Sequence, residues 1–443
     1  MGSSDDIVPG RGAADAIGDE PDRLTMPGYR TRVVEAEVGR ALSRVGAVLI
    51  DGARACGKTW TARRFARSEA RLDDPATLLL AENAPDAVLA GRVPRLLDEW
   101  QHAPALWNRV RRECDDRVGA GQFILTGSAL PTDDITRHSG MGRIGRVRMR
   151  PMSLYEAGHS SGEVSVGALF AGETAAAMPR ADADLTAVAS WLCMGGWPAN
   201  LGATGDDAAR TLGDYINEAV RVEVFEAIGV RHQPEALMRL MRSIARSVAG
   251  EAKITRLAAD TGREAPMTRG TASAYLDALQ RIFVVEPQPA WSVELRSRAT
   301  LRNAPKLHFV DPSLAVSALG ASPRRLLGDP ATFGLLFESL VVRDLRVYSG
   351  AQRCEVYHYR DNVGLEADAV IERPDGAWVA VEVKLSASQR AVDAAARSLL
   401  RLRDKVAPRR VKDLAALLVV TSVGAAYRRS DGVQVAPISA LGP

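Results

Sequence analysis

The segment that most constrains the fold is LIDGARACGKTW, residues 49–60, in which a glycine-rich loop directly follows an apolar run. Gly52 to Thr59 match the pattern G-x-x-x-x-G-K-[ST]. Glycines let a backbone wrap tightly, so that successive N–H groups point at phosphate oxygens. Lys58 would bridge the β- and γ-phosphates, and the Thr59 hydroxyl would hold Mg²⁺. The pattern predicts a buried strand at 48–50, a phosphate-binding loop and a helix over 59–70 that points its positive end at the phosphates. The predicted nucleotide ligands are Gly52, Ala53, Arg54, Ala55, Cys56, Gly57, Lys58, Thr59 and Trp60.

Two further apolar runs end in polar residues. In VPRLLDEWQ a short strand leads to Asp98, which would sit near Mg²⁺, and to Glu99, which would polarise the attacking water. In GQFILTGSAL a buried strand leads to Thr126 and Ser128, which would orient water or the γ-phosphate. Ligands bind at the carboxyl ends of parallel strands, so the three runs predict an α/β fold with a parallel sheet and one catalytic edge.

Arginines follow the third predicted strand. The segment GMGRIG, residues 140–145, matches G-x-G-x-x-G, but no predicted strand precedes it and we expect no dinucleotide site there. Arg143, Arg146 and Arg148 lie in or after this segment. One of them, with Arg143 as the catalytic candidate, would reach a γ-phosphate as an arginine finger. A finger acting on a neighbouring chain would require a homo-oligomer, and ordinary surface arginines are an equally open interpretation.

The motifs GARACGKT, RLDDPATLLLA, LLDEWQ, FILTGSA and GRIGRVRMRPMSLYEAG together resemble one family, the prokaryotic AAA-type ATPases that carry a C-terminal domain of unknown function. In that family a G-x-R-x-x-G-K-T loop is followed by D-E-x-Q, then by T-G-S, and then by a G-R-x segment that leads into P-x-S-x-x-E. MGGWPANL resembles the family's G-G-x-P stretch, and FGLLFESLVVRDL begins the part that resembles its C-terminal domain. Trp60 departs from the small or aliphatic residue usual at that position.

The resemblance covers roughly residues 28–390. It implies a P-loop ATP-binding core with a helical lid, a winged-helix-like middle segment and a C-terminal α/β domain of restriction-endonuclease-like, PD-(D/E)xK, type. The corresponding division of the chain is a disordered tail at 1–27, a P-loop ATPase domain at 28–155, a helical lid or linker at 156–232, a winged-helix-like domain at 233–310 and a nuclease-like domain at 311–443.

The middle segment predicts a helix-turn-helix with a wing. EALMRLMRSIARSVAG, ITRLAADTG and MTRGTASAYLDALQRIFVV are three helical stretches, and the polar segment after them would form the wing. Thr268, Arg269, Thr271 and Ser273 begin the third helix, where DNA-groove contacts would be made. The alternative, that this module only packs between domains, stays open because no strongly basic run accompanies it.

The C-terminal third carries a carboxylate–lysine pattern. Glu338 lies on an amphipathic helix, Asp368 on a strand, and Glu382 and Lys384 two residues apart on another strand, so these two point to one side. Asp368 and Glu382 would hold Mg²⁺, with Glu338 extending the metal shell. Lys384 would stabilise the pentacoordinate phosphate or orient water. Because E-x-K is common on edge strands, an inactive nuclease-like fold is the open alternative.

Composition narrows the classes of protein. A chain of 443 residues suggests two or three domains, and a net charge of +3 means that nucleic-acid contacts must come from local basic patches. The four cysteines form no C-x-x-C pair, which argues against a disulfide framework or a zinc site and fits a reducing cytosol. No window approaches the ~18 apolar residues of a membrane span, and the polar start does not resemble a signal peptide. We therefore expect a cytoplasmic protein.

Three functions are compatible with these patterns. The first is a Mg²⁺-dependent ATP-binding protein or ATPase that acts as a nucleotide-driven switch on the attached domains. The second is an ATP-regulated DNA or RNA nuclease that uses Glu338, Asp368, Glu382 and Lys384. The third is a non-catalytic DNA-binding regulatory protein with a vestigial ATP site. The sequence leaves ATP or GTP preference and the physiological substrate open.

Overall fold

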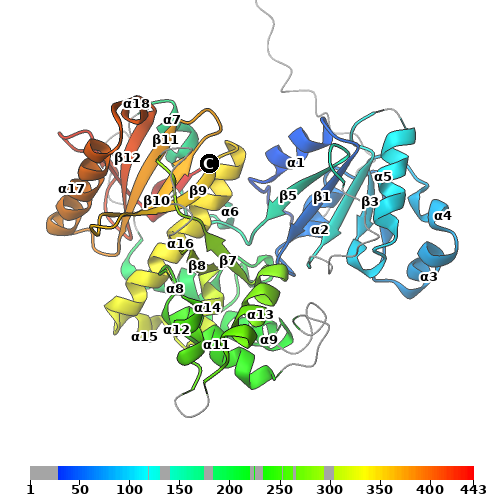
Figure 1. The fold of residues 1–443 in the computed structure, drawn as a ribbon, viewed down its shortest axis with the longest axis horizontal. Coiled ribbons are helices and arrows are strands. Elements are labelled where there is room, and N and C mark those ends of the chain that lie inside the picture. The colour runs from blue at the N-terminus through cyan, green and yellow to red at the C-terminus, as the bar shows by residue number, and fades with distance from the viewer. Residues whose placement is uncertain are drawn as a thin grey trace, which may run out of the picture.

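The computed structural model describes residues 28–117, 119–129, 140–173, 183–219, 224, 233–251, 253–262, 266–293 and 304–443. The predicted disordered tail, residues 1–27, and part of the predicted wing, residues 294–303, lie outside them. The chain forms a P-loop sheet, a second sheet near the C-terminus, and a group of helices below and between them (Figure 1). Within the described part of the chain, no helix is long and apolar enough to cross a membrane.

The N-terminal sheet has five strands, all parallel, in the order β2-β3-β4-β1-β5. Its strands are β1 (Ala47–Gly52), β2 (Ser68–Arg71), β3 (Arg95–Asp98), β4 (Phe123–Gly127) and β5 (Ile144–Met149). The predicted α/β class and parallel sheet are confirmed, and β1, β3 and β4 are the three apolar runs found in the sequence. Ile50 of β1 aligns with Thr126 of β4, so the polar ends of these strands share one edge.

The helices around this sheet differ from the sequence prediction at one place. They are α1 (Glu35–Leu42), α2 (Lys58–Arg63), α3 (Pro75–Asn83), α4 (Pro85–Leu89), η1 (Trp100–His102) and α5 (Leu106–Asp116). The helix predicted over 59–70 is wrong in its second half, because α2 ends at Arg63 and Ser68–Arg71 forms β2. This strand is the sheet edge, where one side of the ladder is open and a polar sequence such as SEAR is tolerated.

Strand β5 was missed from the sequence. Its residues alternate, because Val147 and Met149 are buried, whereas Arg146 is exposed and Arg148 is half-buried. The run of arginines hid a period of two that is typical of a strand with one solvent-facing side. This strand forms the other edge of the sheet, beside β1.

The middle of the chain is mainly helical. Helices α8 (Leu185–Met194), α9 (Gly205–Glu218), α11 (Pro234–Arg246), α14 (Pro312–Ala318) and α15 (Pro323–Leu327) pack together, with η2 (Pro198–Asn200) between α8 and α9. Helices α14 and α15 therefore lie with the middle helices, although the division from sequence assigned them to the C-terminal domain. Helices α12 (Ile254–Ala259) and α13 (Arg269–Arg281) precede the antiparallel strands β7 (Val285–Gln288) and β8 (Lys306–Phe309).

The C-terminal sheet has six strands in the order β13-β14-β12-β11-β10-β9. Its strands are β9 (Glu355–Arg360), β10 (Glu366–Glu372), β11 (Trp378–Lys384), β12 (Leu414–Thr421), β13 (Tyr427–Arg428) and β14 (Gln434–Pro437). The long helix α16 (Pro330–Ala351) covers one face and α17 (Gln389–Lys405) the other, with α18 (Pro408–Lys412) leading into β12. Strand β11 shows why both faces need a helix, since Val379 and Val381 pack into one apolar cluster and Trp378 and Ala380 into another.

A segment between the ATPase sheet and the middle helices packs against the C-terminal lobe and pairs with the chain end in a small two-stranded sheet of its own. After α6 (Leu154–Ala157), strand β6 (Val164–Ser165) pairs with β15 (Leu441–Gly442) near the chain end, which follows η4 (Ile438–Ala440). Helix α7 (Val166–Phe170) packs on β11 and β12 (Figure 1). The first part of the predicted lid, which was expected at 156–232, thus packs on the C-terminal sheet.

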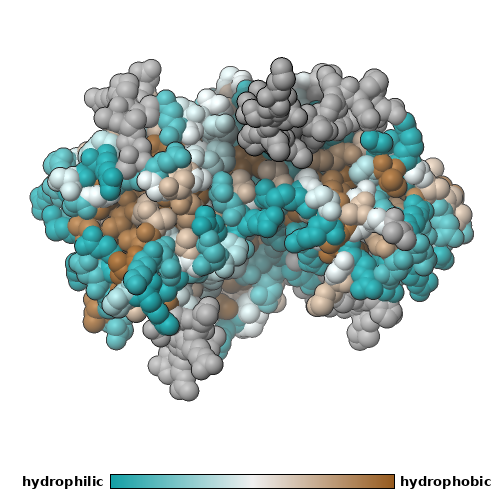
Figure 2. Space-filling view, turned by 90° about the horizontal axis from the view of Figure 1, so that it is seen from above, coloured by the Kyte–Doolittle hydropathy of each residue, from teal (hydrophilic) through white to brown (hydrophobic). Residues whose placement is uncertain are grey.

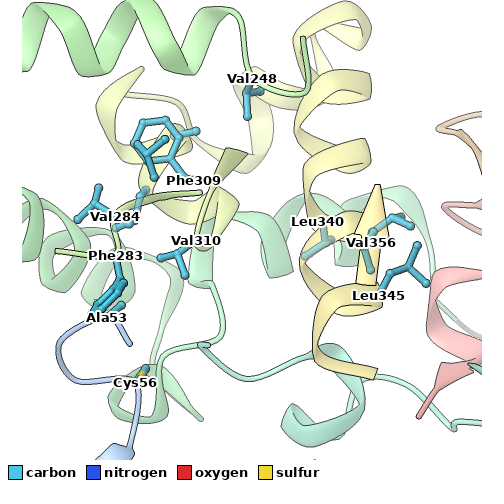
Figure 3. Packing of buried hydrophobic residues seen from close by; sticks show 14 of the residues in the cluster. Ala53, Cys56, Val248, Phe283, Val284, Phe309, Val310, Leu340, Leu345 and Val356 are labelled. Carbon is cyan, nitrogen blue, oxygen red and sulfur yellow. The ribbon is translucent and has the colours of Figure 1, made fainter. Parts of the chain in front are cut away.

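One apolar core joins all these parts. It contains Val48 of β1, Leu240 of α11, Leu340 of α16 and Val381 of β11. Figure 3 shows Ala53 of the P-loop next to Phe283, which lies two residues before the start of β7. Small side chains in the loop therefore serve packing as well as nucleotide binding, and the P-loop lies directly on the middle segment.

Candidate functional site

The P-loop has the backbone shape that its glycines predict. A Cβ at Gly52 would lie 2.0 Å from the carbonyl oxygen of Met149, so only glycine fits against β5 there. Gly57 has φ 104°, in the left-handed region where glycine is favoured, and the following helix α2 begins at Lys58. The buried Lys58 ammonium donates to the carbonyls of Gly52 at 3.0 Å and Ala53 at 2.9 Å. It is therefore held over the loop, in the wall of the adjoining cavity.

Asp98, at the end of β3, contacts residues that follow β1 and end β4. Its Oδ1 accepts hydrogen bonds from the hydroxyls of Thr59 at 2.8 Å and Thr126 at 2.5 Å. Burial raises the pKa of Asp98, although the two threonine hydroxyls work in the opposite direction. A buried carboxylate of this kind gains from a nearby cation, which restores the charge compensation that water no longer supplies.

Glu99 is directed by an unusual backbone conformation. Its φ of 54° lies in the left-handed region, which is uncommon for a residue with a side chain and marks a functional constraint in many sites. Its backbone N–H donates to Thr126 Oγ1 at 3.1 Å. Ser128 Oγ at 3.0 Å and the Gln101 amide both donate to Oε2, which leaves Oε1 for a water molecule. Gln101 was not predicted as a site residue, although it stands in the D-E-x-Q motif.

These groups line one cavity of about 740 Å³, a size that suits a nucleotide. Lys58, Thr59, Asp98 and Glu99 all face it, and Trp60, Arg54, Ala55 and Gly57 of the predicted ligand set are also in its wall. The side chains of Ala53 and Cys56 are fully buried and do not line the cavity. Thr126 and Ser128 also lie outside its wall, but they donate hydrogen bonds to Asp98 and Glu99, which line it. Sequence analysis did not predict the remaining polar wall, which consists of Tyr29, Arg30, Arg32, Arg63, Arg71 and Asp73.

Arg32 ties the P-loop to the segment after β5. Its guanidinium donates to the Cys56 carbonyl at 2.9 Å and the Arg150 carbonyl at 2.8 Å, and it pairs with Glu156 at 3.0 Å. Glu156 closes a capping box with Ser153 at the start of α6. Tyr29 lies beside Arg32 in the wall, and its hydroxyl contacts Thr61 Oγ1 at 2.8 Å. These partners lie up to 124 positions apart, so no local pattern could have identified them.

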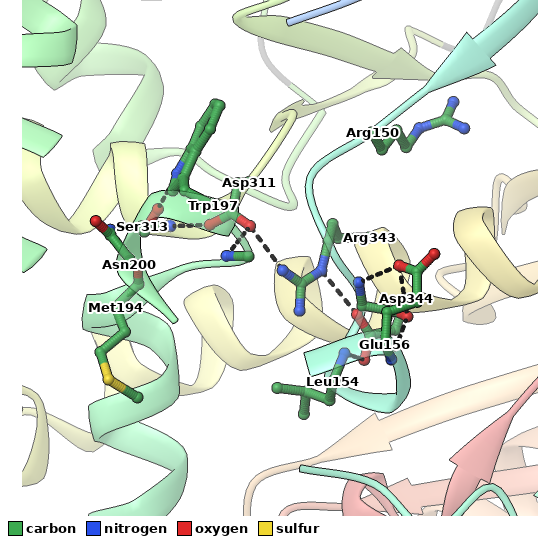
Figure 4. Close-up of polar contacts among 12 residues, drawn as sticks. Arg150, Leu154, Glu156, Met194, Trp197, Asn200, Asp311, Ser313, Arg343 and Asp344 are labelled. Atoms are coloured by element: carbon green, nitrogen blue, oxygen red, sulfur yellow. Dashed lines mark hydrogen bonds and ion pairs between the residues drawn. The ribbon is translucent and has the colours of Figure 1, made fainter. Parts of the chain in front are cut away.

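The G-G-x-P stretch forms another part of the cavity wall through Pro198, Ala199 and Leu201. A Cβ at Gly196 would lie 2.0 Å from the Met152 carbonyl oxygen, which explains the second glycine. The Gly196 N–H donates to Asp311, and Asp311 pairs with Arg343 at 2.6 Å (Figure 4). Arg343 also pairs with Asp344 at 2.7 Å, and Asp344 accepts the Leu154 N–H of α6. This fully buried network connects the lid side of the cavity with α6 and α16.

Arg143 does not lie at this cavity. It stands at the amino end of β5, opposite the P-loop end, and its side chain pairs with Asp115 at 2.7 Å. Six strand residues separate this level from Gly52, which corresponds to about 20 Å. The predicted catalytic role of Arg143 within its own chain is therefore wrong. Arg148 lies nearer, paired with Asp51 at 2.6 Å, but it is on the sheet edge and outside the cavity wall.

The four predicted nuclease residues do come together around the C-terminal sheet. Lys384 pairs with Glu382 at 2.7 Å and lies 3.9 Å from Asp368, whose Oδ2 accepts the Val383 N–H. The pairing of β10 with β9 shifts register at Asp368, a bulge that turns this side chain toward its partners. The unpredicted member is Lys306 of β8, whose ammonium lies 2.6 Å from Glu338 and 3.8 Å from Asp368.

This cluster holds three carboxyl groups and two ammonium groups in a mostly buried place. Burial and then Asp368 raise the pKa of Glu338 to about 8 and that of Glu382 to about 7. Burial alone would lower the pKa of Lys306, but Glu338 and Asp368 raise it overall. A proton shared by the carboxyl groups brings the charges close to balance near neutral pH. One indication of Lys306 was present in the sequence, namely a charged residue at the start of the strand KLHF.

The two predicted metal sites differ in their fit. Thr59 and Asp98 supply a hydroxyl and a carboxylate at the P-loop, the donor pair that holds Mg²⁺ together with phosphate oxygens. Glu338, Asp368 and Glu382 do not fit a metal ion, because Lys306 and Lys384 occupy the positions between them. Among the described residues, no three His, Cys, Asp or Glu side chains form a group that could hold a metal ion.

The predicted DNA-contacting residues lie at the start of α13. Thr268 caps the helix by accepting the Thr271 N–H, and Arg269 and Thr271 are exposed while Ser273 is half-buried. Three helices followed by an antiparallel strand pair are present in the predicted order. Contact with DNA at this helix stays a prediction.

Comparison with known proteins identifies the first part of the chain. Residues 45–158 match the model of an AAA domain, which agrees with a P-loop ATPase fold for the N-terminal sheet. Residues 185–325 and 333–441 match two domains of unknown function, DUF8612 and DUF4143. The boundary between these matches falls after α15, in agreement with the packing of α14 and α15 on the middle helices.

Similar whole proteins are more distant. The uncharacterized proteins Rv2008c of Mycobacterium tuberculosis and Mb2031c of Mycobacterium bovis are each 26% identical over 80% of this chain and 74% of their own length. The Walker-type ATPase PABY2304 of Pyrococcus abyssi superimposes over 66% of this chain and 96% of its own, at 15% identity and a TM-score of 0.40. The replication initiator DnaA, bound to AMPPCP and single-stranded DNA, covers 56% of this chain and 86% of its own, at 13% identity and a TM-score of 0.25.

Proposed function

We propose that this protein is a Mg²⁺-dependent ATPase in which the bound nucleotide acts as a switch on the middle and C-terminal parts. The observation that carries the proposal is the convergence of Thr59 and Thr126 on Asp98 in a cavity that Lys58 and Glu99 also face. The residues that we expect to act as phosphate cradle, cation-binding pair and carboxylate base thus lie at one place. Such a complete set favours a working ATPase over a vestigial nucleotide site.

Each side chain has a role that follows from its position. The P-loop N–H groups and the Lys58 ammonium bind the β- and γ-phosphates once the ammonium leaves the Gly52 and Ala53 carbonyls. Thr59 and Asp98 would hold Mg²⁺, which supplies charge neutralisation at the phosphate oxygens. Glu99 accepts a proton from the attacking water through Oε1, while Ser128 and Gln101 fix its carboxylate through Oε2. Thr126 positions both acids, since it bonds Asp98 and the Glu99 backbone.

The switch part of the proposal rests on what contacts the back of the loop. Phe283 packs against the loop through Ala53, and Arg32 joins the Cys56 carbonyl to Glu156 at the start of α6. Helix α6 is in turn bonded to α16 through Asp344 and the Leu154 N–H. A movement of the loop on phosphate binding would therefore reach the middle segment and α16 through packed, hydrogen-bonded elements.

The finer fold assignments remain part of this proposal. The order α11, α12, α13, β7 and β8 supports a winged-helix-like middle segment. The order α16, β9, β10, β11, α17 and β12, with β11 and β12 parallel, supports a restriction-endonuclease-like sheet. The lysine-filled carboxylate cluster does not support a metal-dependent nuclease, and we propose no cleavage reaction for it.

The direct test is ATP hydrolysis by the full chain and by Lys58→Ala. We expect phosphate release in the variant to fall at least ~100-fold, because the loop loses the ammonium group that its own carbonyls hold beside the cavity. Lys412→Ala is the matched control, since Lys412 is an exposed lysine on α18 and should keep the parent rate. The proposal fails if Lys58→Ala hydrolyses ATP as fast as the parent.

A further inference from the structure

A groove rich in arginine runs along the outer edge of the ATPase sheet, on the far side of β5 from the P-loop. It consists of two adjoining cavities of about 430 and 210 Å³ that share Glu37 and Arg353 in their walls. Together the walls contain seven arginines and three glutamates, a net charge of +4, compared with +3 for the whole chain. Positive charge is therefore concentrated in this groove.

Three segments that are distant in sequence supply the arginines of the groove. Strand β5 supplies Arg146 and Arg148, with Arg150 following, so that the three guanidinium groups recur at every second residue. This spacing is about 6.6 Å per step along a strand. The turn after α1 supplies Arg44, and the turn after α16 supplies Arg353. In Figure 2 hydrophilic side chains gather between the two lobes on the upper face of the molecule.

The arginines divide into two groups. Arg148, Arg150 and Arg346 are bound to Glu286 at distances from 2.9 to 3.5 Å, and they hold the junction of β5, β7 and α16 together. Arg44, Arg146 and Arg353 are exposed, and no acidic partner is seen for them within the described residues. The first group forms a rigid cationic floor, and the second provides guanidinium groups for an external anion.

Arg353 carries a further indication. Its φ is 58°, a left-handed conformation at the end of a helix where glycine is favoured. Backbone strain of this kind costs energy, and residues that carry it cluster at binding and active sites. The Arg353 side chain lines both cavities of the groove.

We propose that this groove binds the phosphate backbone of duplex nucleic acid. Guanidinium groups match phosphate oxygens bidentately, and a regular row of them suits a regular row of phosphates. The walls contain no aromatic side chain, whereas single-strand sites use aromatic rings as stacking platforms and protein interfaces are enriched in them. The partner is recognised by its charge and form, without base-specific contacts.

The test measures binding of a fluorescein-labelled 20-base-pair DNA duplex by anisotropy between 50 and 200 mM salt, without nucleotide. The full chain is compared with the triple variant Arg44→Glu, Arg146→Glu and Arg353→Glu. We expect binding to weaken at least ~10-fold and the slope of log K against log salt to fall by about 3, one unit for each lost phosphate contact. Since nucleotide is absent, the result is independent of the proposed ATPase function.

Two variants make the result specific. Arg390→Glu, Arg397→Glu and Arg401→Glu make the same charge change on the exposed face of α17 and should leave binding as in the parent. Arg44→Lys, Arg146→Lys and Arg353→Lys keep the charge and should retain most of the affinity. Circular dichroism confirms that each variant is folded.

Three outcomes would overturn the proposal. The first is parent-like duplex binding by the triple glutamate variant. The second is binding of the matching single strand as tightly as the duplex. The third is displacement of the duplex by poly-glutamate at equal charge concentration, which would assign the groove to an acidic protein segment. An RNA duplex of the same sequence, measured in parallel, tells which nucleic acid supplies the backbone.

Discussion

Two lysines are buried among the residues that the structure describes, and they are held in opposite ways. The Lys58 ammonium rests on two backbone carbonyls, Gly52 and Ala53, beside a cavity that can admit a ligand. The Lys306 ammonium rests on the carboxylates of Glu338 and Asp368, which already balance its charge. A neutral partner leaves the Lys58 charge available for phosphate, whereas an anionic partner uses up the Lys306 charge within the fold.

The acids at the two places differ in the same way. Asp98 accepts hydrogen bonds from two neutral hydroxyl groups, so a cation bound there would meet no ammonium group among these partners. Glu338, Asp368 and Glu382 each lie near an ammonium group, so a cation would meet positive charge. The comparison teaches that acidic and basic residues in a recognisable order do not define a metal site, because the identity of their neighbours decides which charges remain uncompensated.

The largest effect should come from Glu99→Gln. Replacing the carboxylate by an amide removes the proton acceptor, and we expect ATP turnover to fall by about 10²- to 10⁴-fold. Nucleotide affinity, measured by calorimetry, should stay close to that of the parent, because the cradle and Asp98 are unchanged. Glu82→Gln, at an exposed position on α3, is the control. Equal turnover in both variants would contradict the proposed role of Glu99 as the proton acceptor.

The second prediction separates the two lysines by stability. Lys306→Met leaves Glu338 buried without its ammonium partner and Asp368 with Lys384 alone, and we expect the free energy of unfolding to fall by about 3 kcal/mol. Lys58→Met removes hydrogen bonds to carbonyls only and should change it by about 1 kcal/mol or less. Urea unfolding followed by circular dichroism measures both. A similar loss in the two variants would show that the lysines are not held in different ways.

The third prediction concerns the divalent cation. Mn²⁺ titrations followed by electron paramagnetic resonance should detect no tight site without nucleotide and one site with a non-hydrolysable ATP analogue. Asp98→Asn should weaken that site at least ~10-fold, since it removes a hard oxygen ligand. Glu382→Gln should leave it unchanged. Tight Mn²⁺ binding that Glu382→Gln abolishes would instead restore the C-terminal cluster as a metal site.

The smallest effect should be a pH dependence of stability from the C-terminal cluster. The pKa of Glu338 rises from its ordinary 4.5 to about 8 in the folded protein, so the folded state keeps a proton that the unfolded chain releases. The stabilisation from this group is complete below about pH 4.5 and is lost as the pH rises through about 8. Urea unfolding between pH 5 and 8.5 should therefore show a flatter profile for Glu338→Gln than for the parent. An unchanged slope, as expected for Glu82→Gln, would contradict the raised pKa.

Local sequence patterns were enough to propose a nucleotide site because its parts are consecutive. The loop from Gly52 to Thr59 supplies cradle, cation and hydroxyl within eight residues, and Asp98 and Glu99 follow directly from a buried strand. Parallel strands bring such ends to one edge whatever their separation in the chain. The same reasoning failed for Arg143, because the arginine-rich segment was not recognised as strand β5 and its direction was unknown.

The sequence by itself determined where we propose phosphate chemistry, since that information lies in residue types at short spacing. Only the tertiary structure decided that Arg32 grips the loop, that Lys306 fills the carboxylate cluster, and that arginines from three segments line one groove. These outcomes depend on burial and on electrostatic contacts between residues far apart in the chain. Both quantities are set when the domains pack together, and a one-dimensional pattern does not contain them.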